Sequence, residues 1–167
     1  MVERYSDRIK VWQMWNEPNG TGFWMPKPSP KEYCSLLVAG AEAAKTADPK
    51  CWIVGCNTAH VDLPFIRGVF EEGGYEYSDI ISVHPYPYPH TPETTDLLDD
   101  LSKLAALCAE FGGVKPVWIT EVGYATHRRT RRIGGVVVRR NADADLSVGV
   151  GKWDSAKTFL VRLSRRR

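Results

Sequence analysis

Two glutamates stand at the ends of apolar, aromatic-rich segments. Glu17 follows the stretch VWQMWN and is followed at once by Pro18, and Glu121 follows VWIT. Two carboxyl groups in one cleft suit cleavage of a glycosidic bond, because one gives a proton to the leaving oxygen and the other acts as nucleophile or as base for water. A single glutamate at a strand end is usually only a polar residue, so the pair carries the argument.

This chemistry makes different demands on the two groups. The proton donor needs an apolar wall or a neighbouring negative charge that keeps it protonated near neutral pH, whereas the nucleophile needs hydrogen-bond donors that keep it ionised. Trp15 and Trp24 are candidates for the apolar wall beside Glu17. Trp24 is also a candidate to stack on a sugar ring, and simple packing within its loop is the alternative.

The elements that must position these residues alternate along the chain. Short apolar runs predict strands over residues 9–15, 51–56, 80–84 and 117–121. Helical patterns separate them, over residues 30–47, over 64–72, and from Thr94 or Thr95 through Cys108. This alternation predicts a parallel sheet with crossover helices, and the apolar strands predict cover on both faces. Polar residues gather where the strands end, which is the active face of a parallel barrel.

Three motifs, WNEPN, HPYPYP and VWITEVGY, follow one another in this order. Together they resemble the retaining glycoside hydrolases whose two catalytic glutamates end strands four and seven of a TIM barrel, most of all the cellulase, β-xylosidase and α-iduronidase groups. The resemblance covers residues 9–126. It implies an α/β fold that is a partial (β/α)8 TIM barrel, with about four parallel strands and crossover helices that correspond to strands four to seven.

The resemblance also implies roles for individual residues. Glu17 matches the acid/base of the family and Glu121 its nucleophile. Asn16 matches the asparagine that bonds the sugar 2-hydroxyl, and His84 or Tyr86 matches the residues that hold or flank the nucleophile. A retaining mechanism places the two carboxyl groups about 5–5.5 Å apart.

The implied activity is hydrolysis of β-glycosidic bonds in plant-type polysaccharides or oligosaccharides by double displacement. The alternative is an inert or weakly carbohydrate-binding half-barrel, because the strands that would correspond to strands one to three are missing. The sequence leaves the sugar open, as well as the choice between endo and exo attack.

The remaining tryptophans and the cysteines have plainer interpretations. Trp12, Trp52 and Trp118 lie in the middle of predicted strands and are expected in the core, as is Trp15, although it is nearer the site. The four cysteines lack CxxC spacing and are expected to be buried free thiols, with a disulfide as the alternative in a secreted protein. No spacing suggests a metal site, and no cofactor is expected.

The charge divides the chain into two expected domains. Residues 1–127 carry 10 basic and 17 acidic residues, whereas residues 128–167 carry 12 basic and 3 acidic ones. Within this basic tail, residues 134–138 and 146–150 are candidate strands, and residues 153–163 form the single amphipathic helix candidate. One hypothesis is that the tail is not native family sequence, as after a reading-frame change or at a fragment end. A tail that binds nucleic acid or an anionic surface is less favoured, because RNA-binding patterns are missing.

Partners and location follow from the same features. No run of 18 apolar residues is present to span a membrane, and residues 1–5 lack the apolar core of a signal peptide, which leaves both secretion and the cytoplasm open. A four-stranded open sheet exposes unpaired edges and apolar surface. We therefore expect a homo-oligomer, most simply a dimer of half-barrels that cover each other.

Overall fold

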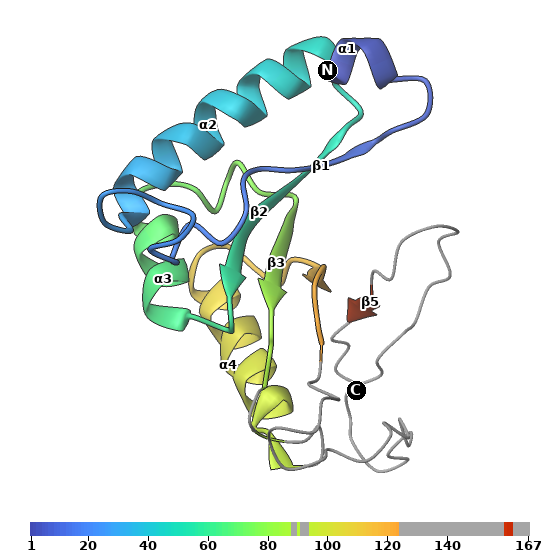
Figure 1. Cartoon of the computed structure of the whole chain (residues 1–167). Helices are drawn as coiled ribbons and strands as arrows, with labels where there is room; N and C mark the ends of the chain where they lie inside the picture. The colour runs from blue at the N-terminus through green and yellow to red at the C-terminus, as the bar shows by residue number, and fades with distance from the viewer. Residues whose placement is uncertain (88–89, 91–93, 124–158, 162–167) are drawn as a thin grey trace.

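The computed structural model describes residues 1–87, 90, 94–123 and 159–161. Its strands and long helices alternate as the sequence predicts (Figure 1), in the order β1 (Val11–Gln13), α2 (Pro30–Ala47), β2 (Trp52–Ala59), α3 (Leu63–Glu71), β3 (Ile80–His84), α4 (Leu97–Glu110) and β4 (Val117–Ile119). Two short elements were not anticipated: a one-turn helix α1 (Val2–Tyr5) and a strand β5 (Phe159–Val161).

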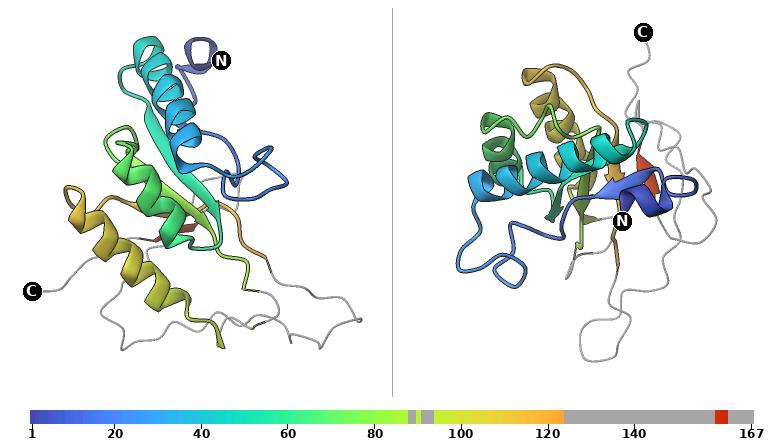
Figure 2. Two further views of the ribbon diagram at one scale, coloured as in Figure 1. Left: turned by 90° about the vertical axis from the view of Figure 1, so that its left-hand side faces the viewer. Right: turned by 90° about the horizontal axis from the view of Figure 1, so that it is seen from above.

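The strands form one sheet in the order β1-β2-β3-β4-β5, in which β1 to β4 are parallel to one another. The helices α2, α3 and α4 lie together along one face of this sheet (Figure 2). The predicted parallel sheet with crossover helices is therefore confirmed. All four parallel strands also end at the same edge of the sheet.

Alternation along the strands separates apolar from polar side chains. In β3, Ile81 and Val83 belong to the hydrophobic core cluster, so Ser82 and His84 point to the opposite face. In β4, Val117 and Ile119 join the same core. Since Val83 pairs with Ile119, the following residue of β3 lies beside Thr120 on the opposite face.

Local signals explain where the helices begin. The Ser29 hydroxyl accepts a hydrogen bond from the Glu32 amide, and Pro30 occupies the first turn of α2, as predicted. Helix α4 begins at Leu97, and the Thr95 hydroxyl accepts a hydrogen bond from the Leu97 amide at 3.2 Å. The N-cap residue is Asp96, without a side-chain cap hydrogen bond, so the expected start at Thr94 or Thr95 is one or two residues early.

Two tryptophans expected in the core are half exposed. Trp15 and Trp52 each expose 50% of their surface. Trp52 is the first residue of β2 and points to the face opposite its core neighbour Ile53, and Trp15 has a φ of 70°, outside the extended conformation of a strand. Trp12 packs against the core as predicted, and Trp118 is half-buried.

All four cysteines are buried free thiols, as expected: Cys34, Cys51, Cys56 and Cys108. Burial is the main cause that raises the pKa of each thiol. These thiols are therefore held protonated in the folded chain and act as small apolar side chains of the core.

The predicted helix over residues 153–163 is wrong, because residues 159–161 within it form a strand. This strand, β5, pairs antiparallel with β4, with Phe159 opposite Ile119 and Val161 opposite Val117. The outer edge of β4 offers unpaired backbone groups, and pairing with them outweighs helical periodicity in a short apolar segment. The candidate strands over 134–138 and 146–150 lie outside the described residues.

None of the helices in the described ranges combines the length and the apolar character that a membrane crossing requires.

Gly55 in β2 tests how tightly the sheet packs. A methyl group at Gly55 would lie 2.0 Å from Ser78 Oγ and 2.9 Å from Ser78 Cβ, inside a fully buried region. We expect Gly55→Ala to lower the free energy of unfolding by about 1–3 kcal/mol, measured by urea denaturation. Gly22→Ala is the matched control, since nothing lies within 4 Å of the added methyl group, and it should change stability by less than about 0.5 kcal/mol. Equal stability of the two variants would contradict this packing.

Candidate active site

The backbone of Glu17 is attached to an irregularity in the neighbouring strand. The pairing of β2 with β3 shifts register between Cys56 and Thr58, which leaves Asn57 as an extra residue. The Glu17 amide donates a hydrogen bond to the Asn57 carbonyl at 2.9 Å, and the Asn57 side chain donates to the Met14 carbonyl at 2.8 Å. The bulge in β2 therefore fixes where the chain turns after β1.

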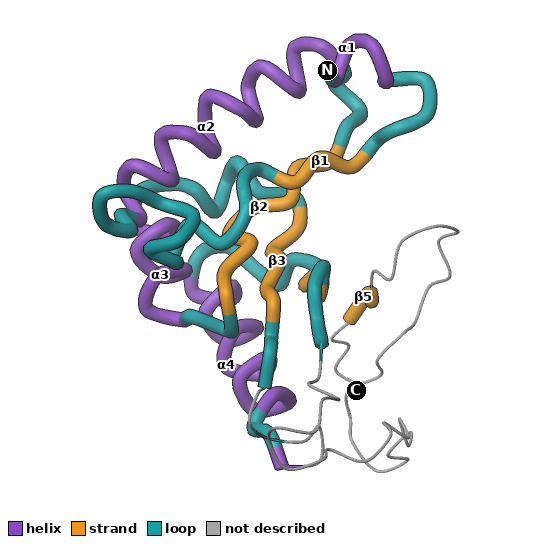
Figure 3. The backbone as a smooth tube through the Cα atoms, viewed as in Figure 1, coloured by secondary structure: helices purple, strands orange, loops and turns teal. Residues whose placement is uncertain are grey.

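A second attachment holds the loop that follows Glu17. The Asn19 amide group donates to the Ala59 carbonyl and to the Asp62 carboxylate, each at 2.9 Å, and its oxygen accepts from the Ala59 amide. The loop from β1 thus runs beside the start of α3 (Figure 3). Nothing in the local pattern distinguishes Asn19 from an ordinary turn residue.

The edge of the sheet near Glu17 contains strained backbone. Among the described residues, the non-glycine residues with positive φ follow β1, form the bulge within β2 or follow β2, and they are Trp15, Glu17, Cys56, Asn57 and His60. Each such conformation costs about 1–3 kcal/mol and persists only where surrounding contacts hold it. Strain of this kind gathers at functional sites, so it marks the same edge as the polar residues do.

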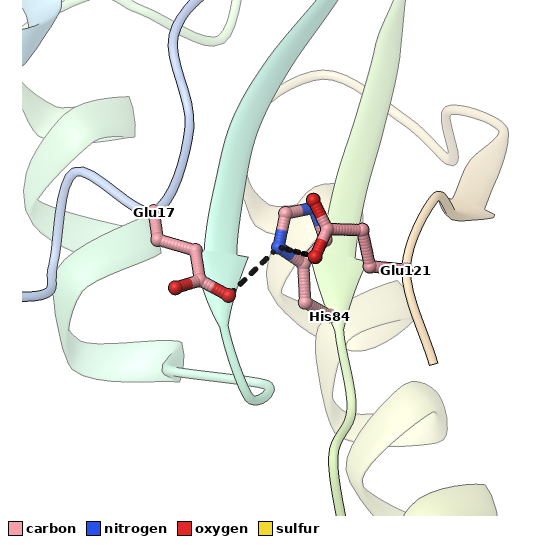
Figure 4. A group of neighbouring side chains, drawn as sticks. All are labelled: Glu17, His84 and Glu121. Atoms are coloured by element: carbon pink, nitrogen blue, oxygen red, sulfur yellow. Dashed lines mark hydrogen bonds and ion pairs between the residues drawn. The ribbon is translucent and has the colours of Figure 1, made fainter. Parts of the chain in front are cut away.

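His84 lies between the two glutamates at this edge (Figure 4). Its Nδ1 atom is 3.0 Å from Glu17 Oε1 and 3.9 Å from Glu121 Oε2. One ring nitrogen of His84 and one oxygen of each carboxyl group all lie within 4.8 Å of one another. The structure therefore brings together the two glutamates that the sequence paired, with one oxygen of each within 4.8 Å of the other.

The other ring nitrogen of His84 is also occupied. Its Nε2 atom is 2.9 Å from Thr120 Oγ1, and Thr120 Oγ1 is 2.6 Å from Ser82 Oγ. His84 is completely buried, so these contacts fix the plane of the ring. Either hydroxyl can be the donor, and the Ser82–Thr120 pair can therefore serve either neutral tautomer of the imidazole. Sequence analysis did not single out Ser82 or Thr120.

Tyr86 holds Glu121. The phenol of Tyr86 donates a hydrogen bond to Glu121 Oε2 at 2.9 Å. The pKa of Tyr86 is raised, first because the phenol is desolvated, then because of the hydrogen bond to Glu121 and the negative charges of Glu121 and Glu17. A side chain at Gly123 would meet the Tyr86 ring, since a built Cβ lies 3.3 Å from it.

Burial and charge distinguish the two glutamates. The side chain of Glu17 is 14% exposed and that of Glu121 is 43% exposed. Within the described part of the chain, no Lys or Arg lies within 4.0 Å of either carboxyl group, and His84 is their one ion-pair partner. Among the described residues, the site thus places two acidic groups together with His84 as their partner and without a Lys or Arg.

The structure does not bring Asn16 and Trp24 into this contact network. Asn16 is half-buried and makes no hydrogen bond with another described residue. Trp24 packs edge-on against Trp15 and Tyr33, and its indole nitrogen donates to Glu32 at 3.1 Å. Trp24 is therefore packed within its loop, whereas Trp15 offers the more exposed ring.

No protein-family model and no curated protein matches the chain. Solved structures do match it. A family 39 β-xylosidase from Caulobacter crescentus is 23% identical with a TM-score of 0.58, over 73% of this chain and 28% of that one. A family 39 glycoside hydrolase from Bacteroides cellulosilyticus WH2 is 24% identical with a TM-score of 0.58, over 75% and 28%.

A third match is a family 51 α-L-arabinofuranosidase from Bifidobacterium longum, 21% identical with a TM-score of 0.54, over 70% of this chain and 27% of that one. This chain therefore spans less than a third of the length of these structures. At this identity the likeness establishes the fold: four parallel strands with alternating helices that match part of a (β/α)8 barrel, as expected.

The contact between Tyr86 and Glu121 predicts a coupled titration. We expect Tyr86 to ionise at a higher pH than an ordinary tyrosine, and Glu121→Gln to lower that pH, because the substitution removes a negative charge beside the phenolate. Ultraviolet absorbance at alkaline pH measures the ionisation, and subtraction of the Tyr86→Phe curve isolates Tyr86. An unchanged Tyr86 titration in folded Glu121→Gln would show that the two side chains are not in contact.

Proposed function

We propose that the chain hydrolyses β-glycosidic bonds by double displacement, with Glu17 as acid/base and Glu121 as nucleophile. The observation that carries this proposal is the meeting of the two carboxyl groups within 4.8 Å at the carboxyl ends of β1 and β4. The structural neighbours named above are glycoside hydrolases, which supports the reaction class. All residues of the proposal lie in residues 1–127, the unit that we propose carries the activity.

The surroundings of Glu121 suit a nucleophile. Tyr86 donates a hydrogen bond to Oε2 and so stabilises the carboxylate form, while Oε1 has no hydrogen-bond partner among the described residues. In the first step, Oε1 bonds to the anomeric carbon as the glycosidic C–O bond breaks. The greater exposure of Glu121 leaves room for the sugar ring on that side.

The surroundings of Glu17 suit proton transfer. His84 contacts Oε1, which leaves Oε2 to face the leaving oxygen. Glu17 gives its proton to that oxygen in the first step. In the second step a water molecule attacks the anomeric carbon, its proton passes to Glu17, and the bond to Glu121 breaks. Each turnover therefore returns both glutamates to their starting states.

A non-catalytic role as a weak carbohydrate binder is the second candidate. The observation that favours it is coverage, because the chain corresponds to less than a third of the length of the enzymes it resembles. Under this alternative the carboxyl groups are in place, but most of the wall that orients a sugar is lacking. We propose β-linked plant-type oligosaccharides as the ligand in either case.

Hydrolysis of aryl β-glycosides and carboxymethyl cellulose separates the two candidates. We expect Glu17→Gln and Glu121→Gln each to lower kcat/KM by at least about 100-fold, because each removes a group required in the transition state. Azide should restore activity to Glu17→Ala on an activated substrate. Glu71→Gln, at an exposed glutamate on α3, is the matched control and should keep the original rate. If the wild type hydrolyses the substrates no faster than Glu17→Gln and Glu121→Gln, the enzymatic function is contradicted and the binding role is supported.

We further propose that two copies associate. Strand β1 is an edge strand, and within the described residues its outer side pairs with no other strand. Two half-exposed tryptophans, Trp15 and Trp52, lie at or beside this edge. Light scattering should give about twice the chain mass of 18.8 kDa. A stable monomer at micromolar concentration would contradict the association.

A further inference from the structure

We propose that Glu17, His84 and Glu121 together bind a divalent transition-metal ion, best matched by Zn²⁺, and that the bound ion blocks the site against the sugar. The binding follows from the ligand atoms themselves, whereas the blocking rests on the proposed function. Sequence spacing suggested no metal because the three residues come from three different strand ends.

The ligand atoms are arranged almost as an ion requires. Zn²⁺ binds imidazole nitrogen and carboxylate oxygen at about 2.1 Å, which places neighbouring ligands about 3.4 Å apart in a tetrahedral site. The observed separations from His84 Nδ1 are 3.0 Å to Glu17 Oε1 and 3.9 Å to Glu121 Oε2. One oxygen of each glutamate lies within 4.8 Å of the other, so the two have to approach to complete the set, and the more exposed Glu121 side chain is the one with room to move.

Two of the three proposed ligand side chains also have a polar partner outside the set, as metal ligands generally do. Thr120 contacts the far nitrogen of His84, and Tyr86 donates to Glu121. The backbone of Glu17 is fixed by its hydrogen bond to Asn57. These contacts lie outside the three-residue group and restrict the ring and carboxyl groups to one small region.

The protons can rearrange to admit the ion. Metal binding at Nδ1 of a neutral imidazole requires the ring proton to sit on Nε2. Thr120 Oγ1 then accepts a hydrogen bond from Nε2 and donates one to Ser82 Oγ, since either hydroxyl of that pair can donate. The described residues place no Lys or Arg within 4.0 Å of the two carboxyl groups, so a cation meets no basic competitor from them.

The ion and the sugar would require the same two carboxyl groups, through different oxygens of each. A metal bound to Glu121 occupies the carboxylate that has to attack the anomeric carbon, and a metal bound to Glu17 displaces the proton that the leaving oxygen needs. Zn²⁺ should therefore act as a competitive inhibitor that raises KM without lowering kcat. Addition of EDTA should reverse the inhibition.

Calorimetric titration of the full chain with Zn²⁺ tests the binding directly. We expect one site, with affinity lowered about 100-fold in Glu17→Gln and in Glu121→Gln, and 10–100-fold in Thr120→Val, which keeps all three ligands but removes the partner of Nε2. His60→Asn is the matched control, because His60 is exposed and its left-handed backbone tolerates Asn. It should keep the original affinity.

Co²⁺ absorbance identifies the ligand type. Imidazole and carboxylate ligands give only weak visible bands, whereas an intense near-ultraviolet charge-transfer band would show thiolate ligation by the cysteines and overturn the proposal. Zn²⁺ affinity that is unchanged in both glutamate variants would overturn it as well. Zn²⁺ binding without hydrolysis would reject the enzymatic function alone, and hydrolysis without Zn²⁺ binding would reject the metal site alone.

Discussion

Parallel pairing of β1 to β4 is the constraint on which the rest of the structure depends. Because the four strands run in one direction, all their carboxyl ends meet at one edge, and the polar residues that follow them have to share that space. The pairing of Val83 with Ile119 then sets His84 beside Thr120. A shift of one residue in that register would turn His84 toward the helices and remove it from between the glutamates.

The position of Glu17 depends on backbone geometry that is unfavourable in isolation. Glu17 and Asn57 both adopt left-handed conformations, and a hydrogen bond between their backbones joins them. The side chains of Asn57 and Asn19 add further bonds to the ends of β1 and β2. Several bonds, each worth about 0.5–1.5 kcal/mol net, offset the strain and hold one carboxyl group in a defined place.

The order of strands and long helices could be predicted from the sequence, because apolar runs and helical periodicity are local patterns. The sequence also singled out Glu17, Glu121, His84 and Tyr86, whose side chains the structure brings into contact at the strand ends. It could not identify Ser82 and Thr120 as partners of His84. Their contact depends on the register between strands whose paired residues are 36 and 38 positions apart in the chain.

The exposure of Trp15 was equally hidden, because its left-handed φ of 70° has no signal in the local sequence pattern. The error at residues 159–161 has a similar cause. A three-residue apolar segment fits a helix or a strand, and only the open edge of β4 decides between them.

The four buried thiols can report local unfolding of the fold through their reaction with an alkylating reagent. A protonated, inaccessible thiol reacts with an alkylating reagent only when the surrounding structure opens, so the rate of labelling measures local unfolding. Cys56 belongs to β2 and Cys108 to α4, while Cys34 belongs to α2. The chain therefore carries natural probes in the sheet and in two of its covering helices, from which the order in which these layers separate can be determined without added labels.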